Sequence, residues 1–198
     1  MTICIIPARG GSTRIPGKNT RMFHGKPILH YSIEVARFSG LFDNGQIWVS
    51  TDSTAVAEVA YEAKANVVFR PDELARNEVG TQEVMRHALE KLGRDLRERA
   101  CCLYATAPLL DPVDLKRGYD QLDYKGVRYA MSVGTDPLAD AGQFYWGTVG
   151  TFVRGEPLIQ PRTVMVPMPS NRVCDINTWQ DWERAEAMYA KLREEATL

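Results

Sequence analysis

Short apolar runs alternate with segments of helical periodicity along most of this chain, and that alternation limits the folds it can adopt. We expect strands near residues 3–6, 46–50, 66–69, 101–106 and 129–133. Helical patterns fall between them, near residues 28–40, 54–64, 81–92 and 112–122. Because the connections are short, the alternation predicts an α/β domain with a mostly parallel, doubly wound sheet. In such a domain a ligand binds outside the carboxyl ends of the strands.

Polar residues mark where several of these helices begin. Either Ser53 or Thr54 can cap the second helix, since a hydroxyl oxygen accepts from the free N–H groups of a first turn. Asp111 followed by Pro112 gives the fourth helix a cap and a proline at its first position.

The pattern changes after Gly134. We expect a brief turn, then an aromatic-rich strand or turn over residues 140–147, then short β segments as far as Val166. The last element is a helix that begins after Thr178, because apolar residues from Trp182 onward recur at helical spacing.

Length and composition indicate one ordinary globular domain. The chain has 198 residues, of which 44% are hydrophobic and 25% charged, enough to bury a sizeable core. No apolar segment approaches the eighteen residues of a membrane span, and the N-terminus lacks a signal-peptide pattern, so we expect a cytoplasmic protein that does not bind membranes. The four cysteines lack metal-ligand spacing, and we expect neither a disulfide nor a zinc site.

The loop after the first strand carries the clearest chemical signal. The first carboxylate of the chain is Glu34, and five cations precede it although the net charge is −1: Arg9, Arg14, Lys18, Arg21 and Lys26. This asymmetry predicts a small polyanionic ligand and not a nucleic-acid surface. Gly10 and Gly11 lack a Cβ, so their backbone can take positive φ and lie against an anion.

The alternative is a surface turn with solvated charges, which would be the better reading of an isolated Gly-Gly-Ser. Its place after a strand favours phosphate binding. The loop matches neither G-x-x-x-x-G-K-[ST] nor G-x-G-x-x-G, so the sequence supports neither a P-loop kinase nor an ordinary dinucleotide site.

Short motifs follow one another along the chain: Ile6-Pro7-Ala8-Arg9-Gly10-Gly11-Ser12, Ile15-Pro16, Lys18-Asn19, Ser50-Thr51-Asp52, Arg70-Pro71 and Asp175-Ile176-Asn177-Thr178. In content and order they resemble the acylneuraminate cytidylyltransferase family, which activates nonulosonic acids as CMP-sugars. Residues 103–109, 140–147 and 172–175 are most similar to its pseudaminic acid branch. The resemblance covers nearly the whole chain and implies a three-layer, Rossmann-like fold of the nucleotide-diphospho-sugar transferase type.

The resemblance also implies a reaction. The anomeric hydroxyl of a nine-carbon acidic sugar attacks the α-phosphate of CTP, and pyrophosphate leaves with Mg²⁺ as cofactor. Such transfers depend mainly on positioning and charge neutralisation. The residues implied as catalytic are Arg9, Lys18 and Asp175. A sialic acid or ketodeoxyoctonate cytidylyltransferase is an alternative to a pseudaminic acid enzyme. A non-catalytic nucleotide-binding protein of the same fold is a further alternative.

By the same resemblance, Arg9, Ser12 and Lys18 hold the phosphates, and Asn19 and Arg70 contact the cytidine. The remaining nucleotide-binding candidates are Ala8, Gly10, Gly11, Arg14 and Thr81. The sugar-binding candidates are Gln143, Phe144 and Tyr145, and the metal ligands are Asp175 and Asn177.

Each role has a structural alternative. Asp175 could simply precede the last helix, and the aromatic residues near Phe144 could pack the core. Asp52 follows a strand at the edge of the sheet where a ligand is expected, and it could either contact that ligand or cap a helix.

Three features depart from the family pattern. Thr13 stands where a lysine is usual, which removes one cation from the loop and predicts a lower phosphate affinity. Asn177 stands where a second aspartate is usual, so we expect metal binding to depend more on CTP. Only six residues separate Val133 from Asp140, where relatives carry an insertion that helps bind the sugar and forms much of a dimer interface. We therefore expect one domain, 1–198, with a shortened segment around 134–147, and a homodimer as a possible partner state.

Overall fold

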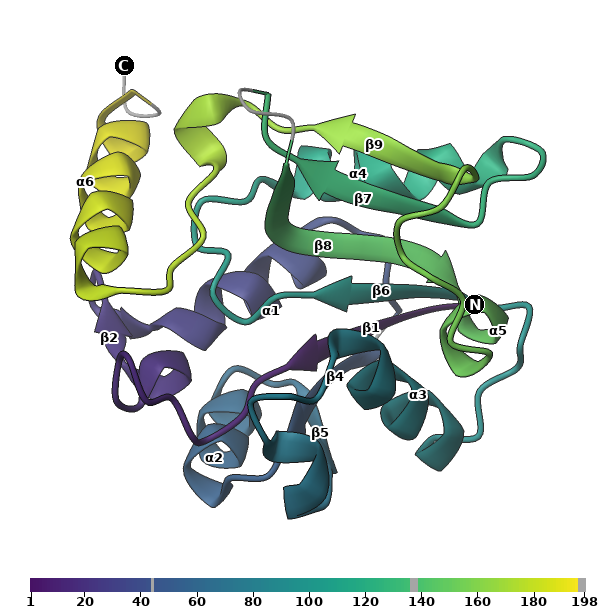
Figure 1. The fold of residues 1–198 in the computed structure, drawn as a ribbon. Coiled ribbons are helices and arrows are strands. Elements are labelled where there is room, and N and C mark those ends of the chain that lie inside the picture. The colour runs from purple at the N-terminus through teal and green to yellow at the C-terminus, as the bar shows by residue number, and fades with distance from the viewer. Residues whose placement is uncertain (44, 136–138, 196–198) are drawn as a thin grey trace.

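The structure is a computed structural model that describes residues 1–43, 45–135 and 139–195. In these residues seven strands form one sheet in the order β5-β4-β1-β6-β8-β7-β9 (Figure 1). The strands are β1 (Thr2–Pro7), β4 (Ile47–Thr51), β5 (Asn66–Phe69), β6 (Arg99–Leu103), β7 (Tyr129–Val133), β8 (Asp140–Thr148) and β9 (Thr163–Pro167). A separate hairpin pairs β2 (Met22–Phe23) with β3 (Lys26–Pro27).

The sheet is mostly parallel, as the alternation predicts. Strands β5, β4, β1 and β6 are parallel neighbours, and β7 and β9 pair in parallel. Only β8, within the described sheet, runs antiparallel to its neighbours β6 and β7. The aromatic-rich stretch 140–147 is therefore a strand and not a turn.

Helices cover both faces of the sheet, which gives the three expected layers. The helices are α1 (Ile28–Phe38), α2 (Thr54–Glu62), α3 (Thr81–Lys91), α4 (Pro112–Asp120), α5 (Val149–Val153) and α6 (Trp179–Glu195). On one face, α1, α2 and α4 pack over a core that contains Cys4, Ile6 and Phe144. On the other, α3 and α5 pack over Ile3 and Ile5. Alternate residues of β1 thus supply opposite cores, as the twofold period of a strand requires.

A third apolar cluster fixes the last helix beside the loop that follows β1. Ile15 from that loop, Phe23 from β2, and Trp182 and Ala185 from α6 are buried together. Phe23 and Trp182 meet edge to face with their ring centroids 5.5 Å apart. This packing brings residues 175–177, which precede α6, to the loop although they lie about 160 positions away in the chain.

Local capping follows the sequence closely. The Ser53 hydroxyl, and not that of Thr54, accepts from the Val56 N–H at 3.4 Å. The Asp111 carboxylate accepts from the Val113 N–H at 2.8 Å, with Pro112 as the first residue of α4. All four cysteines are buried and free.

One expectation from the second half of the chain is wrong, and another cannot be compared. Residues 149–153 form the helix α5 where short β segments are expected. The turn expected near Pro137 lies outside the described residues. No helix in the described part of the chain is long and apolar enough to cross a membrane.

Candidate nucleotide-binding site

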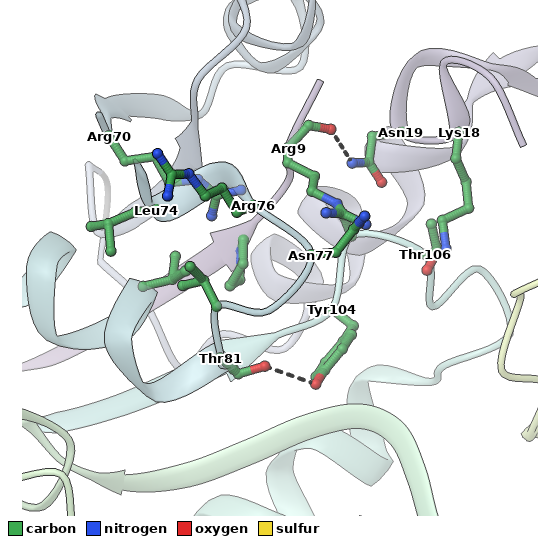
Figure 2. A pocket seen from close by; sticks show the side chains of 14 residues that line it. Arg9, Lys18, Asn19, Arg70, Leu74, Arg76, Asn77, Thr81, Tyr104 and Thr106 are labelled. Atoms are coloured by element: carbon green, nitrogen blue, oxygen red, sulfur yellow. Dashed lines mark hydrogen bonds between the residues drawn. The ribbon is translucent and has the colours of Figure 1, made fainter. Parts of the chain in front are cut away.

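A cleft with a volume of about 250 Å³ opens where β1 and β6 end. Its walls come from the loop after β1, from residues 70–84 and from Tyr104 to Thr106 (Figure 2). This is the carboxyl edge of the sheet, where a ligand is expected in an open α/β fold. The structure brings five of the predicted nucleotide-binding residues to its walls: Arg9, Lys18, Asn19, Arg70 and Thr81.

Polar and cationic side chains gather at one end of the cleft. Asn19 is buried and donates from Nδ2 to the Arg9 carbonyl oxygen at 2.8 Å, which holds the backbone there. The Arg9 guanidinium donates to the Ala75 carbonyl at 3.3 Å, and Lys18 Nζ donates to the Ile176 carbonyl at 2.7 Å. Figure 2 shows Arg9, Asn19 and Lys18 on the same side of the cleft. Their arrangement concentrates positive charge where an anion can enter.

Burial lowers the pKa of Lys18, and the neighbouring Arg14 and Arg9 lower it further, while Asp175 acts in the opposite direction. The ammonium group is therefore poorly solvated and crowded by like charges. A polyphosphate at this end would relieve both effects, because an opposite charge favours the protonated amine.

The other end of the cleft combines apolar walls with a buried arginine. Leu74, Val79 and Val84 line it, and Arg70 is only 7% exposed. The nearest carboxylate oxygen, from Asp52, is 3.8 Å from Arg70 Nη2. Burial lowers the pKa of Arg70, with Asp52 opposing the shift, and its Nε has no hydrogen-bond partner among the described residues. Such a buried donor needs a partner, which a ligand in the cleft or an ordered water can supply.

The glycines of the loop act differently from the expectation. Neither Gly10 nor Gly11 has a positive φ. Instead, a Cβ on Gly10 would lie 2.6 Å from the Ser53 Cβ, so this position requires glycine for close approach of two backbones. The Gly10 N–H donates to Asp52 Oδ1 at 3.1 Å, and Asp52 thereby holds the loop rather than capping α2.

The other predicted loop residues, Ala8, Gly11, Ser12 and Arg14, do not line the cleft. Ala8 is buried, whereas Gly11 and Arg14 are exposed beside it. Arg14 Nη2 donates to Asn177 Oδ1 at 3.0 Å, which joins the loop to the segment before α6. None of these four residues forms a wall of the cleft.

Asp175 and Asn177 lie beside the loop that follows β1, next to Arg14 and Lys18. The Asn177 amide donates to Asp175 Oδ2, so the two predicted metal ligands are neighbours. The described residues contain no group of three or more His, Cys, Asp or Glu side chains that could hold a metal alone. One carboxylate and one amide oxygen fit a Mg²⁺ ion that takes most of its ligands from phosphates and water.

The predicted sugar-binding residues do not line the cleft. Phe144 is fully buried against Gly118, where a Cβ would lie 2.5 Å from its ring, so direct contact of Phe144 with a sugar does not fit this structure. Gln143 is buried and donates to the Arg172 carbonyl. Tyr145 is also buried, but its hydroxyl lies 3.5 Å from that of Tyr104, which does line the cleft.

Sequence reasoning missed several residues of the cleft, among them Arg76, Asn77, Tyr104 and Thr106. Tyr104 and Thr106 carried a usable signal, because they directly follow β6 at the carboxyl edge of the sheet. Arg76 and Asn77 lie in an irregular segment before α3, whose path the sequence does not specify.

A mostly parallel sheet between two layers of helices, with a cation-lined cleft at its carboxyl edge, is the arrangement found in α/β proteins that bind ligands at that edge. The chain belongs to the cytidylyltransferase family, whose model matches residues 3–165.

Curated relatives and solved structures agree with this assignment. The chain is 35% identical to the pseudaminic acid cytidylyltransferase of Campylobacter jejuni, over 98% of either protein. It is 36% identical over 107 residues to the N-acylneuraminate cytidylyltransferase of Streptococcus agalactiae, which covers 54% of this chain and 25% of that protein. The fold is similar to CMP:2-keto-3-deoxy-manno-octonic acid synthetase complexed with CTP, at a TM-score of 0.76 and 16% identity over 96% and 98% of the two chains.

A second similar structure is Rv0371C of Mycobacterium tuberculosis in complex with manganese, with a TM-score of 0.66 and 18% identity over 94% and 97% of the two chains. At these identities the structural likenesses establish the fold alone. The Campylobacter alignment extends over 231 residues, more than the 198 of this chain, so parts of that relative have no counterpart here.

Proposed function

We propose that this protein activates a nonulosonic acid, pseudaminic acid foremost, by transferring CMP from CTP and releasing pyrophosphate. The cleft carries the proposal: Arg9 and Lys18 lie on one side of it, and Arg70 and Arg76 lie with Leu74 on the other (Figure 2), where Arg70 is buried and its Nε has no hydrogen-bond partner among the described residues. A triphosphate suits the first side and a cytosine the second. The relative of 35% identity over nearly the full length supports pseudaminic acid as the acceptor.

The residues of the cleft suit a displacement at phosphorus. Arg9 and Lys18 would neutralise the triphosphate and the charge that develops on the leaving pyrophosphate. Lys18 is held by the Ile176 carbonyl, so its ammonium group is positioned before the ligand arrives.

We further propose Mg²⁺ as the cofactor, held by Asp175 and Asn177 together with the nucleotide. The manganese complex of a protein with the same fold supports a divalent ion. A bound Mg²⁺ would polarise the phosphate oxygens and stabilise the leaving group. Asn177 Oδ1 already accepts from Arg14, so the ion would share this oxygen through its second lone pair, or Arg14 would turn to the nucleotide.

We place the reaction in the cytoplasm, where CTP is made, with no nucleic-acid or membrane partner. We also propose a homodimer. The shortened segment around residues 134–147 affects this part of the proposal, because the insertion that relatives carry there forms much of a dimer interface. The chain is proposed to act as a single domain.

Pyrophosphate release from CTP tests the function. Purified protein is incubated with CTP and Mg²⁺ and with pseudaminic, N-acetylneuraminic or ketodeoxyoctonic acid in turn, and the CMP-sugar is identified by mass spectrometry. We expect turnover with pseudaminic acid, and none after chelation of the metal. Turnover only with another acid would change the acceptor. Tight CTP binding without turnover on any acid would favour a non-catalytic nucleotide-binding protein. Asn177 would be consistent with this outcome, because a neutral amide holds a metal ion less strongly than the usual aspartate.

A further inference from the structure

A chain of hydroxyl groups leads from the cleft to an exposed carboxylate outside it. Thr81 Oγ1 lies 3.0 Å from Tyr104 Oη, and Tyr104 Oη lies 3.5 Å from Tyr145 Oη. The Tyr145 hydroxyl donates to Asp140 Oδ2. Thr81 and Tyr104 line the cleft (Figure 2), whereas Asp140, at the start of β8, does not.

Asp140 determines the direction of every hydrogen bond in this chain. An ionised carboxylate only accepts, so Tyr145 must donate to it. A hydroxyl has one proton, so Tyr145 can then only accept from Tyr104, and Tyr104 in turn can only accept from Thr81. Burial raises the pKa of both tyrosines, which keeps their protons in place at neutral pH.

As a consequence, the Thr81 hydroxyl can act toward a ligand in the cleft only as a hydrogen-bond acceptor. With its proton committed to Tyr104, the Thr81 hydroxyl offers only lone pairs to a ligand. Thr81 is the first residue of α3 and lines the cleft together with Val79 and Val84. Apolar side chains of this kind suit the flat faces of a base, and a base placed against them would meet an acceptor at Thr81.

We propose that Asp140 acts through Tyr145 and Tyr104 as a positioning residue that makes Thr81 a selector for the exocyclic amino group of cytosine. The amino group at position 4 of cytosine donates, whereas the oxygen that uracil carries there accepts. An acceptor at Thr81 pairs with the first and repels the second. The inference rests on the proposed use of a cytidine nucleotide and adds the origin of its selectivity.

The Asp140→Asn variant tests the direction of the chain. The Gly142 N–H donates to Asp140 Oδ1 at 2.9 Å, so an amide oxygen would keep that position and turn its NH₂ group toward Tyr145. Tyr145 would then donate to Tyr104, Tyr104 to Thr81, and Thr81 to the ligand. The variant therefore reverses the hydrogen-bonding character at the base while leaving the side-chain volume almost unchanged. Because Asp140 is exposed, we expect it to fold.

The readout is the ratio of the dissociation constants for UTP and CTP, measured by calorimetry on the full chain. We expect Asp140→Asn to lower this ratio about tenfold, the size of one hydrogen bond gained for one and lost for the other. Tyr104→Phe and Thr81→Val should also lower it, because each removes the fixed acceptor. Matched controls are Asp43→Asn and Tyr124→Phe, whose side chains are exposed and outside the cleft.

The outcomes separate this inference from the proposed function. If wild-type protein binds neither nucleotide, or binds UTP as well as CTP, the cytidylyl assignment fails and the inference fails with it. If wild-type protein prefers CTP and Asp140→Asn leaves the ratio unchanged, the function stands and the role of Asp140 is overturned. An unchanged ratio in Thr81→Val would likewise overturn the contact between Thr81 and the amino group.

Discussion

At the scale of single residues, the cations around the cleft differ in how much they contribute to the fold. The Arg9 side chain makes one hydrogen bond among the described residues, to the Ala75 carbonyl, and Arg9 is only half-buried. Arg70 is almost completely buried and lies near Asp52. Arg9 is therefore the residue at which binding can be changed with the least effect on folding.

We predict that Arg9→Ala weakens CTP binding at least tenfold and lowers the unfolding free energy by no more than about 1 kcal/mol, the size of one hydrogen bond. Calorimetric titration with CTP and thermal unfolding measure the two effects. Arg37→Ala is a matched control, since Arg37 donates to the Ala63 carbonyl away from the cleft. A large fall in melting temperature with unchanged CTP affinity would exclude the phosphate role of Arg9.

A second residue-scale prediction concerns the neutral side chain at Asn177. Its amide donates to Asp175 Oδ2, so Asn177→Asp would bring two carboxylates together. Their repulsion is relieved by a cation, so we expect Mn²⁺ affinity without nucleotide to rise about tenfold and thermal stability without metal to fall. Titration with Mn²⁺, with and without CTP, measures this, and Asn171→Asp is an exposed control. Equal affinities in wild type and variant would show that charge at this position does not limit metal binding.

Which residues of the site the sequence can predict depends on how local their signal is. Arg9, Lys18 and Asn19 directly follow β1, so position alone predicts that they reach the cleft. Asp140 is different: Gly142 has a φ of 60°, and the pairing of β7 with β8 shifts register between Met131 and Val133. This irregularity breaks the twofold alternation of side chains along β8. The spacing of Asp140 and Tyr145 in the sequence therefore does not predict that their side chains meet.

At the scale of elements, the start of α6 determines where the metal candidates lie. The Thr178 hydroxyl accepts from the Asp181 N–H at 3.2 Å, and the Asp181 carboxylate accepts from the Thr178 N–H at 2.8 Å, which forms a capping box. The same carboxylate accepts from the Asn177 N–H at 3.1 Å. One side chain thus stabilises the helix and fixes the backbone of the segment that carries Asp175 and Asn177.

We predict that Asp181→Ala destabilises the protein by about 1 kcal/mol at pH 7, as loss of a cap does. Partial burial alone would raise the pKa of Asp181, but hydrogen bonds from Thr178 and Asn177 outweigh it and lower that pKa. A lowered pKa gives stability above the unfolded value near 4, and that stability is lost as the pH falls through the folded value. The difference in melting temperature between wild type and variant should therefore be constant from pH 7 to about 5 and shrink below about 4. A difference that grows as the pH falls would contradict the capping role.

The elements that sequence predicts best are those with a long periodic pattern or a distinct cap. α1, α3 and α6 have both apolar periodicity and clear ends, and each lies where it is expected. α5 was missed because five residues, Val149 to Val153, are too few to show a helical period and continue the apolar composition of β8. Its only local sign is Thr148, whose hydroxyl caps the helix by accepting from the Thr151 N–H at 3.2 Å.

At the scale of the whole molecule, five of the predicted nucleotide-binding residues line one cleft, whereas the segment between β7 and β8 is short. The cleft depends on β1, β6, α3 and the contact with the segment before α6, all of which the core fixes. The alignment with the Campylobacter relative is longer than this chain. If the additional residues lie between β7 and β8, as the resemblance implies, their absence affects the acceptor sugar and not CTP.

We predict that the Michaelis constant for the acceptor sugar falls at least tenfold when the corresponding segment of the Campylobacter protein is inserted between Thr135 and Ala139, while the dissociation constant for CTP changes less than twofold. The physical reason is that the two substrates would contact different elements. The cations that would bind CTP, Arg9, Lys18 and Arg70, do not belong to β7 or β8. Residues added between these two strands would therefore contact the sugar alone. A Gly/Ser segment of equal length is the control, because it adds length without side chains that bind. Steady-state kinetics with varied sugar, together with sedimentation to follow dimer formation, measure the outcome. Equal Michaelis constants for the graft and the control would mean that the sugar is bound by residues the chain already has.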